Sequence, residues 1–246
     1  MPFLTRWDED QTRPAFTSAL RDVAVRAVLP ALGVFAVIVA FGFLLKGPLY
    51  SFSEWENNVN RWFQDGRTAT GEAVTEYMSM IGNTEYVIGV AVLVSAIVWW
   101  RTKQWWFAVV PLIAISLQAT VFVAATTVVG RDRPNVERLD PTPPTSSYPS
   151  GHVGAATALY LSFALMATRI ANVWVRRVVI ALCILAPILV GYARLYRGAH
   201  HPSDVFWGVV NGVLCALLAW NYLRREPGGT GDDDDATRED TVQTRA

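Results

Sequence analysis

The sequence predicts an all-α integral membrane protein, built as a bundle of about six transmembrane helices with an interfacial helix in the first outer loop. The 246 residues are 52% hydrophobic and only 17% charged, and their mean hydropathy is +0.27. This balance is too apolar for an ordinary soluble domain of the same length. The apolar residues also occur in blocks that approach the roughly 20 residues needed to cross a bilayer. A globular core would interrupt such blocks with polar positions at helical or strand period, and these blocks have almost none.

Six apolar segments are expected to form the spans. They comprise residues 23–45, 86–100, 105–129, 153–166, 178–196 and 205–223, of which the second and fourth are the shortest. Before the second span, residues 52–63 place Trp55, Trp62 and Phe63 at helical spacing. This pattern predicts an amphipathic helix that lies at the outer membrane interface and is anchored there by its aromatic side chains.

The domain organisation follows from these segments. We expect residues 1–22 to form a cytoplasmic amino-terminal segment, residues 23–225 the membrane domain, and residues 226–246 a disordered acidic cytoplasmic tail. The first segment is polar and charged, so no cleaved signal is expected and the first span stays as an anchor. The expected location is the plasma (inner) membrane.

The basic residues predict the orientation. With both termini in the cytoplasm, the inner loops hold Arg101, Lys103, Arg176 and Arg224, as the positive-inside rule requires. The same orientation leaves eight cations outside, which the rule does not explain. They are Lys46, Arg61, Arg67, Arg131, Arg133, Arg138, Arg194 and Arg197.

Three polar clusters fall on the same, outer side of this topology. They are residues 130–134 (Gly-Arg-Asp-Arg-Pro), residues 148–152 (Tyr-Pro-Ser-Gly-His) and residues 194–204, which run from an arginine to an aspartate. All three histidines of the chain lie in these clusters. The net charge of zero, from 21 basic and 21 acidic residues, argues against a nucleic-acid partner.

The clusters contain the parts that phosphoryl transfer requires. Arg133 and Arg194 carry guanidinium groups that match phosphate oxygens in pairs, and Arg131 is a further phosphate-binding candidate. Ser150 and Gly151 add a hydroxyl group and backbone amides at the start of a helix, where an anion is favoured. We also expect the glycine to let the backbone approach the phosphate closely.

The histidines are predicted to share the acid and nucleophile roles. His200 and Asp204 are four residues apart, so on a helix they share a face and the carboxylate can hold the imidazole in one tautomer. His200 is therefore the expected nucleophile, and His152 the expected acid for the departing alkoxide. His201 points elsewhere and is expected to be structural. The competing interpretation is that the arginines contact lipid headgroups and that Asp204 is a helix cap.

The three clusters resemble the signature of the type 2 phosphatidic acid phosphatase family, Lys-x6-Arg-Pro, Pro-Ser-Gly-His and Ser-Arg-x5-His-x3-Asp. Arg133-Pro134 fits the end of the first motif, residues 149–152 fit the second, and Arg194, His200 and Asp204 fit the third. The resemblance implies a six-helix core shared with vanadium haloperoxidases, a site facing away from the cytoplasm and a phosphohistidine intermediate. It also implies that no metal or other cofactor is needed, and that the substrate is a lipid phosphate or diphosphate.

Two positions depart from the family pattern. Thr126 stands where the motif has lysine, and Ala193 where it has serine. The threonine removes a cation from the phosphate site unless Arg131, Arg138 or Arg197 replaces it.

Three alternatives to a lipid phosphatase therefore stay open. They are a phosphotransferase with an acceptor other than water, a metal-dependent hydrolase that uses His152, His200 and Asp204 as ligands, and an inactive lipid-binding member of the family. The sequence gives no indication of the oligomeric state.

Overall fold

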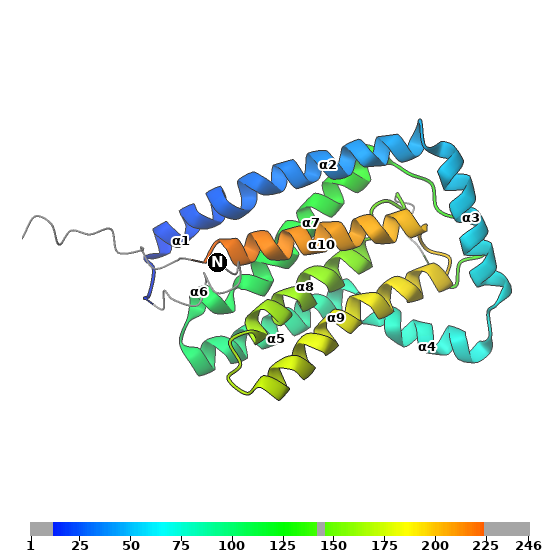
Figure 1. Cartoon of the computed structure of the whole chain (residues 1–246). Helices are drawn as coiled ribbons and strands as arrows, with labels where there is room; N and C mark the ends of the chain where they lie inside the picture. The colour runs from blue at the N-terminus through cyan, green and yellow to red at the C-terminus, as the bar shows by residue number, and fades with distance from the viewer. Residues whose placement is uncertain (1–11, 142–145, 224–246) are drawn as a thin grey trace, which may run out of the picture. The chain divides into compact units, whose positions relative to one another are not determined.

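The computed structural model describes residues 12–141 and 146–223, and all regular secondary structure in these residues is helical. Figure 1 shows the order of the helices. Their bounds are α1 Phe16–Val23, α2 Leu29–Lys46, α3 Tyr50–Asp65, α4 Ala69–Met80, α5 Thr84–Thr102, α6 Trp105–Ala108, α7 Val110–Val129, α8 Gly151–Ala167, α9 Val173–Tyr196 and α10 Pro202–Asn221. The residues predicted to form the acidic tail lie outside the described part of the chain.

Within residues 12–141 and 146–223, five helical segments are long and apolar enough to cross a membrane. They are Phe16–Lys46, Thr84–Thr102, Trp105–Val129, Val173–Tyr196 and Pro202–Asn221. Helix α8 is apolar but shorter, at 17 residues. These six segments coincide with the six predicted spans, which confirms the predicted all-α membrane bundle.

The first span begins earlier than predicted. Helices α1 and α2 are joined by one π turn, Ala24–Val28, so the helix starts at Phe16 instead of residue 23. Its buried side chains Ala19, Ala27, Ala31 and Ile38 form one stripe, while most other positions are exposed. The helix therefore starts inside the segment expected to be cytoplasmic, because a stripe of small residues continues past the apolar block that the sequence emphasises.

Helix α8 is the centre of the bundle. It packs against α7, α9 and α10, and eleven of its residues are buried. Glycines make this packing close: a Cβ atom at Gly212 of α10 would lie 2.6 Å from the Gly154 carbonyl oxygen of α8. Small residues at such crossings let membrane helices approach through their backbones. A rigid central helix of this kind fixes the position of His152 at its first turn.

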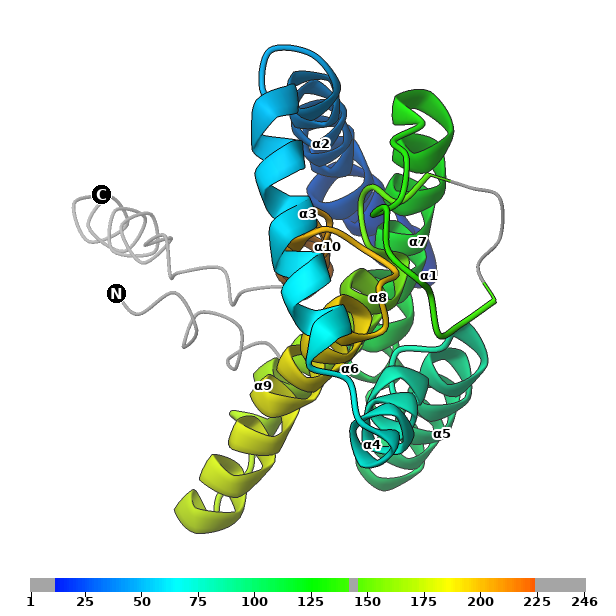
Figure 2. The same ribbon diagram turned by 90° about the vertical axis from the view of Figure 1, so that its right-hand side faces the viewer.

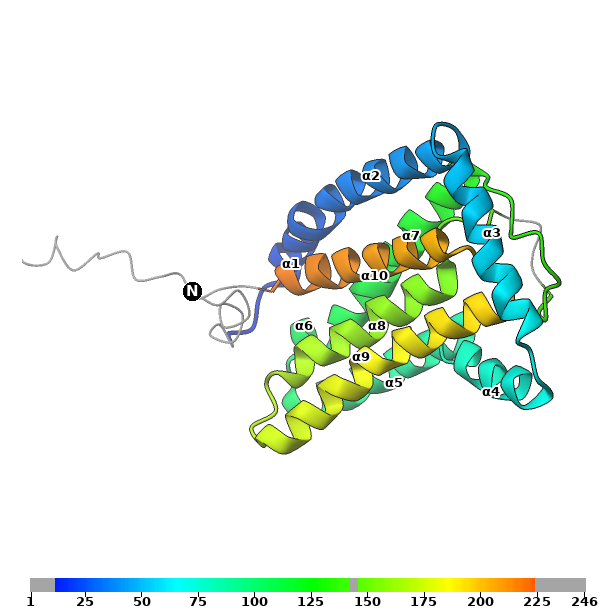
Figure 3. The ribbon, with the colours of Figure 1, turned by 45° about the vertical axis from the view of Figure 1, so that its right-hand side comes forward.

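Helix α3 crosses the end of the bundle, as Figures 2 and 3 show from two sides. It covers the predicted interfacial segment 52–63 and extends it at both ends. Its inward face is polar, with Glu56 and Asn60 fully buried, whereas Trp55 and Trp62 are 55% and 70% exposed. The aromatic side chains thus face outward, as expected for interface anchors, and the buried polar face points toward the loops at this end.

The three polar clusters meet at the end of the bundle that α3 covers. The first follows α7, the second precedes α8, and the third joins α9 to α10. Their spatial coincidence, which the topology predicts, is present in the structure.

Candidate active site

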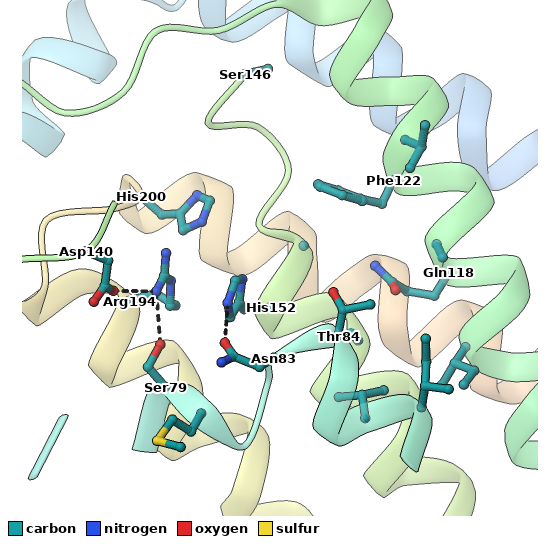
Figure 4. A pocket seen from close by; sticks show the side chains of 18 of the residues that line it. Ser79, Asn83, Thr84, Gln118, Phe122, Asp140, Ser146, His152, Arg194 and His200 are labelled. Atoms are coloured by element: carbon teal, nitrogen blue, oxygen red, sulfur yellow. Dashed lines mark hydrogen bonds and ion pairs between the residues drawn. The ribbon is translucent and has the colours of Figure 1, made fainter. Parts of the chain in front are cut away.

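A cavity of about 680 Å³ opens where the three clusters meet. Arg133, Gly151, His152, Arg194 and His200 all line it, and Figure 4 shows the last three side chains close together. From this polar end the cavity continues between α5 and α7, along side chains such as Val87, Ile115 and Phe122. The cavity thus joins a cationic, histidine-containing head to an apolar slot.

His200 is held by a backbone carbonyl group. Its Nδ1 atom lies 2.7 Å from the Ser147 oxygen, and the nearest Asp204 oxygen is 3.9 Å away, beyond hydrogen-bonding distance. The predicted hydrogen bond between His200 and Asp204 is therefore wrong, because the segment before α10 is not helical at His200. Since a carbonyl oxygen only accepts, Nδ1 must carry the hydrogen, which leaves the lone pair on Nε2.

Burial lowers the pKa of His200 well below the ordinary value, and the charge of Arg194 lowers it further. Asp204 and the Ser147 carbonyl oppose this shift but do not cancel it. The imidazole is consequently neutral at physiological pH, as a nitrogen nucleophile must be.

Asp204 organises the loop that carries His200. One carboxylate oxygen accepts a hydrogen bond from the His201 backbone N–H at 2.7 Å, at the start of α10, and the other pairs with Arg131 at 2.6 Å. The helix cap that the sequence left open for Asp204 is therefore present, and His201 is the histidine in contact with it.

Arg131 belongs to a buried ion-pair network and does not line the cavity. Its guanidinium group pairs with Asp204 and, at 2.8 Å, with Glu56 of α3. Glu56 also accepts hydrogen bonds from the backbone N–H and the hydroxyl group of Ser203. The predicted phosphate-binding role of Arg131 is thus corrected: two carboxylates already occupy its donors.

Arg194 and Arg133 line the cavity, and each has guanidinium N–H groups that are not fully used by the protein. Arg194 bonds to Ser79 at 2.9 Å and to Asp140 at 2.8 Å, and Arg133 bonds to the Ala199 carbonyl oxygen at 2.8 Å. In each arginine, however, the buried Nε atom has no hydrogen-bond partner within the described residues. Buried donors without partners are rare, and a bound ion is one of the explanations for them. An anion such as phosphate meets that need.

Asp140 holds two arginines in place. It bonds to Arg197 as well as Arg194, with the shortest contact to Arg197 at 2.5 Å. Burial alone would raise the pKa of Asp140, but the hydrogen bonds from Arg197 and the charge of Arg194 outweigh burial and leave the pKa lowered. Because Arg197 and Arg131 are both fixed by carboxylates, neither is free to replace the lysine missing at Thr126.

His152 projects into the cavity from the first turn of α8. Its Nε2 atom lies 2.8 Å from the Asn83 side-chain oxygen (Figure 4). An amide oxygen only accepts, so Nε2 carries a hydrogen and Nδ1 is the position at which a proton is gained or lost. Asn83 thereby fixes the tautomer of His152.

The two remaining predicted phosphate ligands are placed differently. Gly151 lines the cavity, but a Cβ atom there would lie 2.7 Å from the Phe122 ring, so the glycine is needed for this ring contact. Ser150 is fully buried beside α10 and does not line the cavity, although its hydroxyl group has no partner among the described residues.

Several site residues were missed by sequence reasoning: Glu56, Ser79, Asn83, Asp140 and Ser147. Four of them hold the arginines and histidines in place through side-chain contacts, and Ser147 does so through its backbone. The one signal in the sequence was the surplus of arginines on the side predicted to be outside, which would need acidic partners.

Comparisons with known proteins agree with this architecture. The model of the PAP2 superfamily matches residues 105–227. A transmembrane PAP2-type phosphatidylglycerolphosphate phosphatase from Bacillus subtilis is similar in structure, with a TM-score of 0.69 and 18% identity, over 77% of this chain and 93% of that one. LpxE from Aquifex aeolicus has a TM-score of 0.53 and 20% identity, over 66% of this chain and 92% of that one. No curated protein sequence matches the chain.

Proposed function

The chain belongs to the PAP2 superfamily, and from this premise we propose that it is a membrane phosphatase that hydrolyses a lipid phosphate or diphosphate monoester through a phosphohistidine at His200. Membership confirms the family predicted from the three motifs and, with it, the phosphatase class. Phosphatidic acid, phosphatidylglycerol phosphate and polyprenyl phosphates or diphosphates are the substrate types that suit the site. No cofactor is included in the proposal.

One observation carries the proposal: the unpartnered Nε atoms of Arg133 and Arg194 lie at the polar head of a cavity whose remainder is an apolar slot between membrane helices. A phosphate group fits the head because it accepts charge-assisted hydrogen bonds from both guanidinium groups. The acyl or prenyl chain of the same lipid fits the slot, which would let it enter from the side.

The reaction follows from the fixed tautomers of the two histidines. The His200 Nε2 lone pair attacks phosphorus, and the bond from phosphorus to the lipid oxygen breaks. Protonated His152 donates its Nδ1 proton to that oxygen, so the lipid alcohol leaves neutral. Neutral His152 then takes a proton from water, which attacks the phosphohistidine and releases inorganic phosphate. Arg133 and Arg194 stabilise the equatorial phosphoryl oxygens in both steps.

Purified protein tested against the four lipid types named above gives a direct test. We expect inorganic phosphate to be released from at least one of them, with no change in strong chelator. Phosphate appearing on an added sugar or lipid acceptor would instead identify a phosphotransferase, and loss of activity in chelator would identify a metal-dependent hydrolase. If no lipid is dephosphorylated, Thr126→Lys distinguishes a binding protein, because activity that appears only in this variant means that the missing cation had abolished turnover.

The lowered pKa of His200 predicts the acid limb of the pH profile. A histidine with a lowered pKa stays neutral until the pH falls through that lowered value, and protonation then removes the attacking lone pair. We expect the acid limb of kcat/KM, on which His200 becomes protonated, to lie below about pH 6.5, the ordinary histidine pKa. The acid limb should fall at the same pH for two substrates whose phosphate groups differ in pKa, because it then reports a group of the enzyme and not of the substrate. A shared limb above pH 7 would contradict the assignment.

We also propose that the protein lies in the plasma (inner) membrane with both termini in the cytoplasm, so that residues 1–22 and the tail 226–246 flank a membrane domain whose active site faces outward. The proposal rests on the basic inner loops of the sequence. A single cysteine introduced at exposed Arg138 should react with an impermeant reagent in intact cells. Labelling that requires lysis would reverse the orientation.

A further inference from the structure

The cavity contains a third buried donor that the phosphate group does not explain. Among the cavity-lining residues, three side chains have a buried polar atom with no partner in residues 12–141 and 146–223. Two are the Nε atoms of Arg133 and Arg194, assigned above to phosphate. The third is the side-chain amide nitrogen of Gln118, on α7.

Gln118 lies deeper along the slot than the phosphate head. It is one helical turn before Phe122, whose ring lies against Gly151, the neighbour of His152. Its side chain is only 2% exposed, and its amide nitrogen packs on the bare backbone of α8 at Gly154, where a Cβ atom would lie 2.4 Å away. Figure 4 shows the amide directed from α7 toward the side of the cavity on which His152 lies.

An unpaired amide nitrogen inside an apolar span is costly, because the bilayer offers no water to satisfy it. Polar side chains in such places usually mark the path or the site of a ligand. A ligand atom opposite the Gln118 amide nitrogen must accept a hydrogen bond. Because Gln118 and the two arginines line the same cavity, an acceptor close to the phosphate ester oxygen of the lipid suits this position. Glycerolipid phosphates carry acyl ester carbonyls at that point, whereas polyprenyl phosphates carry only hydrocarbon.

Building on the proposed function, we infer that Gln118 donates a hydrogen bond to an ester carbonyl oxygen of the substrate and makes the enzyme selective for diacylglycerol-type lipid phosphates. Gly154 keeps the space that the amide needs. Gln118 is a specificity determinant and takes no part in the chemical steps.

The test compares diacyl phosphatidic acid with its dialkyl-ether analogue of equal chain length, since the two differ only in the carbonyl groups. We expect wild-type kcat/KM to be roughly tenfold higher for the ester, the usual effect of one hydrogen bond in a buried site. Gln118→Met keeps the length of the side chain and removes the donor, so the ester-to-ether ratio should fall to near one, chiefly through KM for the ester. The melting temperature of Gln118→Met should not fall below that of the wild type, because the substitution removes a buried amide nitrogen that has no partner in the described residues.

Gln104→Met is the matched control. It makes the same substitution in the turn between α5 and α6, at the opposite end of the bundle (Figure 1), and should keep the wild-type ratio. A ratio that stays unchanged in Gln118→Met, or a wild-type preference for polyprenyl phosphate, would overturn the inference. Absence of turnover on every lipid would count against the proposed function alone. In that case, the affinities of His200→Ala protein for the ester and ether lipids are compared at equilibrium, with and without Gln118→Met. Their ratio then decides the role of Gln118.

Discussion

Replacing His200 by alanine is expected to lower phosphate release by roughly 10³-fold or more, the loss typical of a removed nucleophile. Among the described residues the imidazole makes one hydrogen bond, to the Ser147 carbonyl oxygen, so we expect the fold to survive the substitution. Melting in detergent should stay close to that of the wild type while activity disappears.

Reactions with ³²P-labelled substrate, stopped in base, separate the two histidine roles. Wild-type protein should carry label on nitrogen, which is released in acid and kept in base, and His200→Ala should carry none. His152→Ala should still be labelled with a phenolic leaving group, which departs without a proton, because His152 serves only as acid and base. His201→Asn is the matched control: it alters the adjacent buried histidine, and its label should persist. Label that persists in His200→Ala would remove His200 as the nucleophile.

The sequence predicted the helices and the meeting of the three clusters because both depend on local patterns. Apolar blocks of sufficient length give spans, and the parity of six spans places residues 130–134, 148–152 and 194–204 at one end. The structure brings Arg133, His152, Arg194 and His200 from these clusters to a single cavity. Family motifs strengthened this prediction, since they fix both residue type and order.

The partners of these residues could not be read from local pattern. Glu56 and Asn60 lie on the polar face of an amphipathic helix, and the sequence alone predicts that this face is exposed to solvent. Both residues are in fact fully buried. The spacing of His200 and Asp204 suggested contact on a helix, but α10 begins only at Pro202, so the geometry of the preceding turn decides the partner. Such contacts join residues distant in the chain, and one sequence carries no record of them.

The cations that the predicted orientation leaves outside make contacts of the same kind. Three of the eight, Arg131, Arg194 and Arg197, are paired with buried or partly buried carboxylates. Lys46 and Arg67 donate to backbone carbonyl oxygens instead. These five cations therefore have partners within the protein, which explains why the positive-inside rule does not account for them.

The buried network gives the second large prediction: Arg131→Met should destabilise the protein strongly. The substitution leaves Glu56 and Asp204 buried without their counter-charge, and breaking a buried pair on one side costs about 3–5 kcal/mol. We expect the melting temperature in detergent to fall by roughly 10 °C. Activity should fall with it, because the network holds the turn between His200 and Ser203.

Two further variants decide whether Arg131 acts through the fold or on phosphate. Arg138→Met removes an exposed arginine from the same connection and should leave melting unchanged. Adding Glu56→Gln to Arg131→Met removes one of the stranded carboxylates, so the double variant should melt above the single one. A phosphate ligand would behave differently: melting would hold in Arg131→Met and KM would rise, with no rescue by Glu56→Gln. Only the structural role predicts rescue, because only there does Glu56 share the cost of the missing charge.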